Sequence, residues 1–219
     1  MNSVSNFPTL IQTTYFWKME KKKKVMLGLK LPTDPRWVNI VEKNISEILT
    51  DHAYCEQKAA SNAITNIIRH PDIPELVEAM IRIAKEEMEH FGQVHDIIQR
   101  KGFQLGRERK DEYVHEISAF IKRGGDSRER QVVDNMLFGA MIEARSCERF
   151  RVLSQEISDP ELAAFYHDLM VSEADHYTTF ISLARKYGTG IDVDARWKEI
   201  LEFEGQLMLK YGKKETVHG

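Results

Sequence analysis

The fold is decided by two short stretches with the same polar signature. Residues 80–94 read MIRIAKEEMEHFGQV and residues 169–183 read LMVSEADHYTTFISL. In both, apolar residues recur at helical spacing, yet a Glu-x-x-His pair lies on the apolar side. The pairs are Glu87 with His90 and Glu173 with His176. Burying a lone charge is costly, so such carboxylates must be paired, metal-bound or protonated.

Each pair is preceded by another carboxylate on an apolar stripe. Glu56 stands 31 residues before Glu87, and Glu143 stands 30 residues before Glu173, which indicates two similar hairpins. One Glu from each of two helices and Glu-x-x-His from each of two others is the pattern of di-iron and di-manganese carboxylate bundles. We therefore expect an all-α, ferritin-like four-helix bundle. Its two metal ions would be held by Glu56, Glu87, His90, Glu143, Glu173 and His176.

The residue types also favour particular metals. Mixed imidazole and carboxylate ligands suit iron, with manganese second, whereas zinc would need fewer ligands and calcium would not choose histidine. Buried salt bridges or solvated helix faces are the alternative explanation of the same six residues. Glu112 and His115 have the same spacing, but no carboxylate stands 30 or 31 residues earlier, so we expect no metal there.

Prolines, glycines and capping residues predict where the helices begin and end. They bound four long helices: one from Pro35 to before Pro71, one from Pro74 to Gly102, one after Asp126-Ser127, and one from Pro160 to near Gly188. A crossover of about 25 residues should join the second and third helices, with a short amphipathic piece over residues 113–121 closed by Gly124-Gly125. A last helix over residues 197–209 should pack outside the bundle.

Composition limits the class of protein. The chain has 219 residues, 42% hydrophobic and 30% charged, with a net charge of −3 that gives no general attraction to nucleic acid. No apolar run is long enough to span a membrane, and the N-terminal lysines follow the mildly apolar opening instead of preceding it, so we expect a cytoplasmic protein. The two cysteines form no Cys-x-x-Cys pair, so a metal must use His and carboxylates.

We expect one domain with an extra segment before it and another after it. Residues 26–212 form the di-iron domain and residues 213–219 a C-terminal tail. Residues 1–25, with their run of lysines, form an N-terminal extension that is disordered, a mis-assigned start, or an RNA-binding arm.

Three phrases carry a family resemblance. Residues 142–150 read IEARSCERF, residues 51–61 read DHAYCEQKAAS, and residues 172–177 read SEADHY. From about Met26 to the C-terminal helix, the chain resembles the bacterial tRNA 2-methylthio-N6-isopentenyladenosine hydroxylases (MiaE). The resemblance implies a di-iron monooxygenase that uses dioxygen to hydroxylate the isopentenyl group beside the anticodon of tRNA.

Other functions remain open at this point. A ferritin-like iron-storage or peroxide-scavenging protein is the main alternative, and a noncatalytic RNA-binding helical domain is the third, against which the six metal-ligand candidates argue. For the hydroxylase we expect an external electron donor such as a ferredoxin or reductase, because the chain has no Cys-x-x-Cys or flavin signature. We expect a monomer or small homo-oligomer.

Several residues near the six candidates have more than one possible role. Arg145 and Arg149 could orient carboxylates, contact RNA phosphate or form salt bridges. His52 lies one turn before Glu56 and could hold that carboxylate from outside the metal site. Tyr54 and Tyr177 are further neighbours, whereas Cys55 and Cys147 are better explained as small core residues. A basic crossover face, either solvated or bound to tRNA phosphates, contains Arg107, Arg109, Lys110, Lys122, Arg123, Arg128 and Arg130.

Overall fold

The computed structural model describes residues 27–122, 127–211 and 216–217, and within these ranges it contains helices and no strand. The elements are η1 (Pro35–Trp37), α2 (Val38–Lys43), α3 (Ile45–Arg69), α4 (Pro74–Arg100), α5 (Glu112–Ile121), α6 (Arg128–Glu156), α7 (Pro160–Tyr187) and α8 (Val193–Tyr211). The expected extension over 1–25, the Gly124-Gly125 pair, Asp126, and most of the tail lie outside the described residues. None of the described helices is long and apolar enough to cross a membrane.

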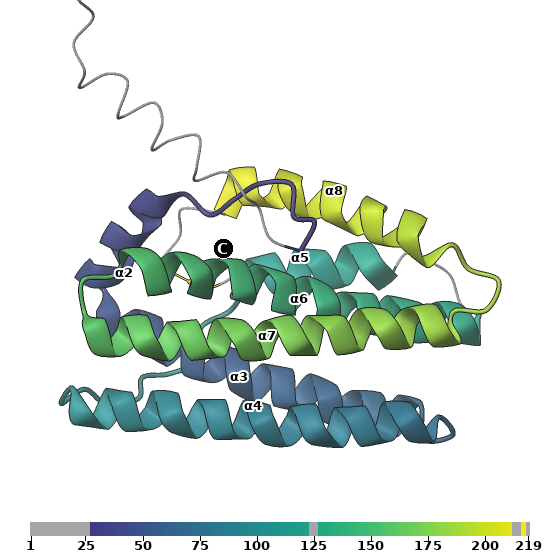
Figure 1. Ribbon diagram of the computed structural model, residues 1–219, viewed down its shortest axis with the longest axis horizontal. Helices are drawn as coiled ribbons and strands as arrows, with labels where there is room; N and C mark the ends of the chain where they lie inside the picture. Colours follow the sequence, from purple (N-terminus) through teal and green to yellow (C-terminus); the bar gives the residue numbers. More distant parts are fainter. Residues whose placement is uncertain (1–26, 123–126, 212–215, 218–219) are drawn as a thin grey trace, which may run out of the picture.

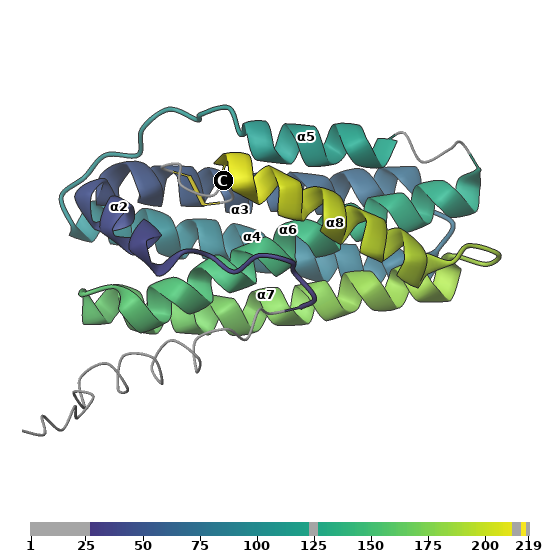
Figure 2. The same cartoon turned by 90° about the horizontal axis from the view of Figure 1, so that it is seen from above.

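The bundle consists of two helical hairpins, α3–α4 and α6–α7, which lie against each other (Figure 1). The crossover after α4 contains α5, and α5 and α8 together cover the outside of the bundle over α6 (Figures 1 and 2). This confirms the predicted four-helix bundle, the long crossover and the additional C-terminal helix.

These helices begin or end at the proline, glycine and capping residues that predicted their termini. Pro74 opens α4, and Ser127 caps α6 by accepting a hydrogen bond from the backbone N–H of Arg130. The Asp159 carboxylate caps α7, which ends before Gly188. Proline lacks the N–H that a first turn leaves unsatisfied, and the capping oxygens accept others, so these residues fix where each helix starts.

The prediction of one unbroken helix from Pro35 to before Pro71 is wrong. The chain breaks at Asn44, where φ is −131° and ψ is 36°, between α2 and α3. The Asn44 side chain donates a hydrogen bond of 2.9 Å to the carbonyl oxygen of Ile40, four residues earlier. Asparagine competes for backbone groups in this way, which explains why the apolar pattern continues while the helix does not.

The core is divided by a polar layer. On α4, Met80 and Ile83 belong to one apolar cluster, whereas Val94 and Ile97 belong to another. Glu87 and His90 lie between the two groups along the helix and are themselves buried. The six metal-ligand candidates therefore occupy the middle of the bundle, with apolar packing on both sides.

Buried polar bonds attach the outer helices to α6. The guanidinium of Arg145 donates to Glu204 Oε1 on α8 through Nε at 2.8 Å and Nη2 at 2.5 Å, and Nη2 also donates to the Leu31 carbonyl at 3.1 Å. The hydroxyl of Tyr113 on α5 donates to the same carboxylate oxygen at 3.2 Å. Arg145, Glu204 and Tyr113 are fully buried, so a single carboxylate joins α5, α6 and α8.

Candidate metal centre

The four long helices bring the six predicted residues together in the core. Glu56 comes from α3, Glu87 and His90 from α4, Glu143 from α6, and Glu173 and His176 from α7. None of the six is more than 8% exposed. The spacing in the sequence thus becomes one compact cluster because each residue lies on the inner face of its helix.

The cluster consists of two overlapping groups. Ligand atoms of Glu56, Glu87, His90 and Glu173 all lie within 4.8 Å of one another, and so do those of Glu87, Glu143, Glu173 and His176. Glu87 and Glu173, the glutamates of the two Glu-x-x-His pairs, belong to both groups. The arrangement can hold two cations that share these two carboxylates, with one further Glu and one His for each.

Several atoms of the cluster have no hydrogen bond within the described part of the chain. They are both carboxylate oxygens of Glu87, Oε1 of Glu173, Nδ1 of His90 and Nδ1 of His176. His176 Nδ1 lies 2.9 Å from Glu87 Oε1, but without hydrogen-bonding geometry. Buried polar atoms are almost always satisfied. Metal coordination would satisfy these oxygen and nitrogen donors, which suit iron or manganese.

The electrostatics of the cluster indicate a shortage of positive charge. Burial, and then repulsion from neighbouring carboxylates, raises the pKa of Glu87, Glu143 and Glu173. Burial opposes protonation of the imidazoles, but the surrounding carboxylates outweigh it and raise the pKa of His90 to about 10 and that of His176 to about 9. These carboxyl groups and imidazoles therefore bind protons more tightly than usual. Divalent cations would neutralise the negative charge of the cluster in the same way as these protons do.

Glu56 behaves differently from the other carboxylates. Burial opposes its ionisation, but contacts with Glu87, His52 and His90 lower its pKa to about 2. His52 Nε2 lies 2.6 Å from Glu56 Oε1. His52 is thus the outer partner that its position one turn earlier predicted, and it orients the Glu56 carboxylate.

Glu86 is a contact that the sequence analysis missed. Its Oε2 lies 2.7 Å from Nε2 of His176, the ring nitrogen that faces away from Glu87. A metal-binding histidine usually donates its second N–H to a carboxylate, which fixes the tautomer and the ring orientation. The rule predicts that such a partner exists, but acidic residues are too frequent in this chain for it to select Glu86.

Tyr166 was also missed. It is fully buried on α7 with its ring stacked at 5.5 Å from His52, and its hydroxyl has no hydrogen bond among the described residues. The two tyrosines singled out from the sequence lie elsewhere: Tyr54 donates to the Gly106 carbonyl, and Tyr177 packs against Trp197.

The arginines after Glu143 have a structural role. Arg145 and Arg149 are fully buried, which excludes a contact with RNA phosphate. Arg145 forms the salt bridge with Glu204, and the Arg149 guanidinium lies 4.0 Å from the ring centre of Trp37. Of the three roles considered, the salt bridge is the one that the structure shows for Arg145.

The remaining candidates lie outside the cluster. Glu112 and His115 are on α5, and neither joins a potential metal group among the described residues. The same holds for Cys55 and Cys147, and the Cys147 thiol instead donates to the Met170 carbonyl.

The basic crossover face is partly neutralised by acidic neighbours. Lys110 lies 2.9 Å from Glu112, Arg130 lies 3.0 Å from Asp134, and Arg128 pairs with Asp72. Arg123 lies outside the described residues. A contact between this face and tRNA stays a prediction.

Two relatives with the same name match most of the chain. A protein 36% identical over 173 residues, 79% of this chain and 82% of the relative, is the tRNA 2-(methylsulfanyl)-N(6)-isopentenyladenosine(37) hydroxylase of Pseudomonas putida. The hydroxylase of the same name from Salmonella typhimurium is 26% identical and covers 89% of this chain and 88% of its own.

A solved structure supports the fold. The protein from Synechococcus with aldehyde deformylating oxygenase activity superposes with a TM-score of 0.78 at 30% identity, covering 89% of this chain and 96% of that chain. The model of the tRNA-(MS[2]IO[6]A)-hydroxylase (MiaE) family matches residues 19–219. The chain therefore belongs to the MiaE family.

Proposed function

We propose that this protein is a di-iron monooxygenase that hydroxylates the isopentenyl group of 2-methylthio-N6-isopentenyladenosine in tRNA, next to the anticodon. The observation that carries the proposal is the membership of a hydroxylase family together with a buried cluster of four carboxylates and two imidazoles. As a tRNA-modifying enzyme it would act in the cytoplasm, as a monomer or small homo-oligomer.

Each of the two overlapping groups of ligand atoms would hold one iron ion. Glu56 and His90 would bind one ion, Glu143 and His176 the other, and Glu87 with Glu173 would bind both. Four carboxylates balance the charge of two divalent ions, which lowers the cost of burying them. Iron bound there would supply the activation of dioxygen.

The protein residues around the cluster control orientation and access of water. His52 holds Glu56 through a 2.6 Å contact, and Glu86 holds the outer nitrogen of His176 at 2.7 Å. The two apolar clusters on either side keep bulk water from the centre. Electrons would come from a separate donor, such as a ferredoxin or reductase, because the sequence has no Cys-x-x-Cys pair.

The test is hydroxylation of the modified nucleoside itself. The protein is loaded with ferrous iron and given labelled dioxygen, a reducing system and tRNA bearing the isopentenylated adenosine, and the nucleosides are then identified by mass. We expect one labelled oxygen atom on the isopentenyl group, and loss of this product with Glu143→Ala. An unchanged nucleoside, together with iron mineralisation or peroxide consumption, would replace this proposal with the storage or scavenging function.

A further inference from the structure

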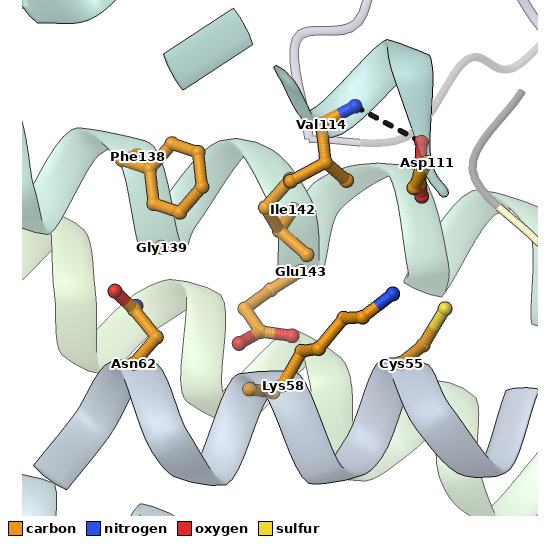
Figure 3. A pocket seen from close by; sticks show the side chains of 10 residues that line it. Cys55, Lys58, Asn62, Asp111, Val114, Phe138, Gly139, Ile142 and Glu143 are labelled. Atoms are coloured by element: carbon orange, nitrogen blue, oxygen red, sulfur yellow. Dashed lines mark hydrogen bonds between the residues drawn. The ribbon is translucent and has the colours of Figure 1, made fainter. Parts of the chain in front are cut away.

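A small cavity adjoins the candidate metal centre. It lies between α3, α5 and α6 and has a volume of about 50 Å³. The carboxylate of Glu143 reaches into it from α6, opposite Asn62 and Lys58 of α3 (Figure 3). A group that enters this cavity therefore lies beside one of the residues of the metal cluster.

The walls of the cavity are largely hydrocarbon. Ala59 lines it from α3. Val114 comes from α5, and Phe138 and Ile142 come from α6 (Figure 3). Apolar walls favour an apolar guest, because its transfer from water removes hydrocarbon surface from solvent. The cavity is thus suited to a hydrocarbon group placed next to Glu143.

Its size limits what that group can be. A volume of about 50 Å³ has room for roughly four water-sized groups, judged by the space that one buried water needs. A short branched hydrocarbon fits this space, whereas a fused purine ring with its ribose does not. The base of a modified nucleoside would have to stay outside.

Polar side chains also line the same cavity. Lys58 is held there by the crossover, with its Nζ 2.9 Å from Glu108 Oε1 and 3.4 Å from the Arg109 carbonyl. Asn62 and Asp111 also line the cavity, and the Asp111 carboxylate caps α5 by accepting from the N–H of Val114 (Figure 3). The crossover therefore supplies a fixed wall, since its own hydrogen bonds hold both Val114 and Lys58 in position.

We propose that this cavity binds the isopentenyl group alone, with the adenine and ribose outside it, and that Ala59 and Val114 set the size limit from opposite walls. The inference rests on the proposed function, because that function supplies the identity of the guest.

The experiment narrows the cavity without touching the six metal-ligand candidates. Ala59→Leu adds bulk from α3 and Val114→Phe adds it from α5. Ala164→Leu makes the same chemical change at an exposed position of α7 and serves as the matched control. Each variant is assayed for helicity, bound iron, affinity for the modified tRNA, and kcat/KM for hydroxylation.

We expect both cavity variants to keep wild-type helicity, iron and tRNA affinity, because the base and the phosphates bind outside. Their kcat/KM should fall by about ten-fold or more, the usual effect of a misfitting methyl-sized group in an apolar pocket. Ala164→Leu should match the wild type.

Two results would overturn the inference, and they are distinguishable. If the wild type hydroxylates the tRNA and either folded, iron-loaded cavity variant does so with unchanged kcat/KM, the cavity is not the isopentenyl site. If the wild type leaves the tRNA unmodified, the proposed function fails, and the guest assigned to the cavity fails with it.

Discussion

The two overlapping groups of the cluster predict unequal effects for two glutamates that look alike in the sequence. Glu87 belongs to both groups and Glu56 to one. Both are buried, so each substitution removes an inner carboxylate and not a surface charge. We consider Glu87→Ala and Glu56→Ala, in protein loaded with ferrous iron without oxygen and then freed of unbound metal.

The expected loss of iron depends on how many of the two groups each glutamate joins. If each group holds one ion, Glu56→Ala would take a ligand from one ion only, so the protein should keep about half of the wild-type iron. Glu87→Ala would take a ligand from both ions and should keep almost none. Glu112→Ala, in the third Glu-x-x-His pair, should bind iron like the wild type because α5 lies outside the cluster.

The assay is the amount of iron per folded chain, with circular dichroism to show that helicity is retained. Equal iron loss in Glu56→Ala and Glu87→Ala would refute the assignment of Glu87 as a shared ligand. Equal loss in Glu112→Ala would refute the choice of Glu-x-x-His pairs altogether.

Further predictions concern the residues around the centre and the chain ends. Glu204→Leu leaves the buried Arg145 guanidinium without its carboxylate and should lower the free energy of unfolding in urea by about 3–5 kcal/mol, with recovery in the Arg145→Met, Glu204→Leu double variant. A loss close to zero would contradict a structural role for the pair. Glu86→Ala removes the outer partner of His176 and should weaken iron binding by about 10–100-fold in a competition titration, while unchanged affinity would show that the contact is incidental. Deletion of residues 1–25, which contain none of the six metal-ligand candidates, should leave helicity and iron binding intact; loss of tRNA affinity alone would identify an RNA-binding arm.

The architecture and the residues of the cluster could be predicted because the spacing of apolar and polar residues along the sequence indicates both. A carboxylate such as Glu143 on an apolar stripe stands out against its neighbours, and the repeated spacing pairs it with Glu173. Capping residues such as Ser127 and Asp159 also act within a few residues of themselves, which is why α6 and α7 begin where predicted.

Features that depend on contacts between distant segments could not be predicted in the same way. Periodicity places Arg145 on α6 but does not show that α8 brings Glu204 over it, 59 residues later. The break at Asn44 was not predicted for a related reason. The apolar pattern continues on both sides of Asn44, and it carries no sign of the side-chain hydrogen bond to Ile40. Glu86 was hidden because its role depends on which nitrogen of His176 faces outward.

The position of α6 also determines which parts of the protein can unfold locally. The helix packs against α7 and α3 on the bundle side and against α5, α8 and α2 on the other, and every residue from Glu143 to Phe150 is buried. A backbone amide exchanges its hydrogen with solvent only when its hydrogen bond opens, and detachment of α5 and α8 would still leave α6 packed against α7 and α3. The amides in the middle of α6 should therefore exchange the most slowly in the described chain, at a rate set by global unfolding, whereas those of α5 should exchange through detachment of the outer layer alone.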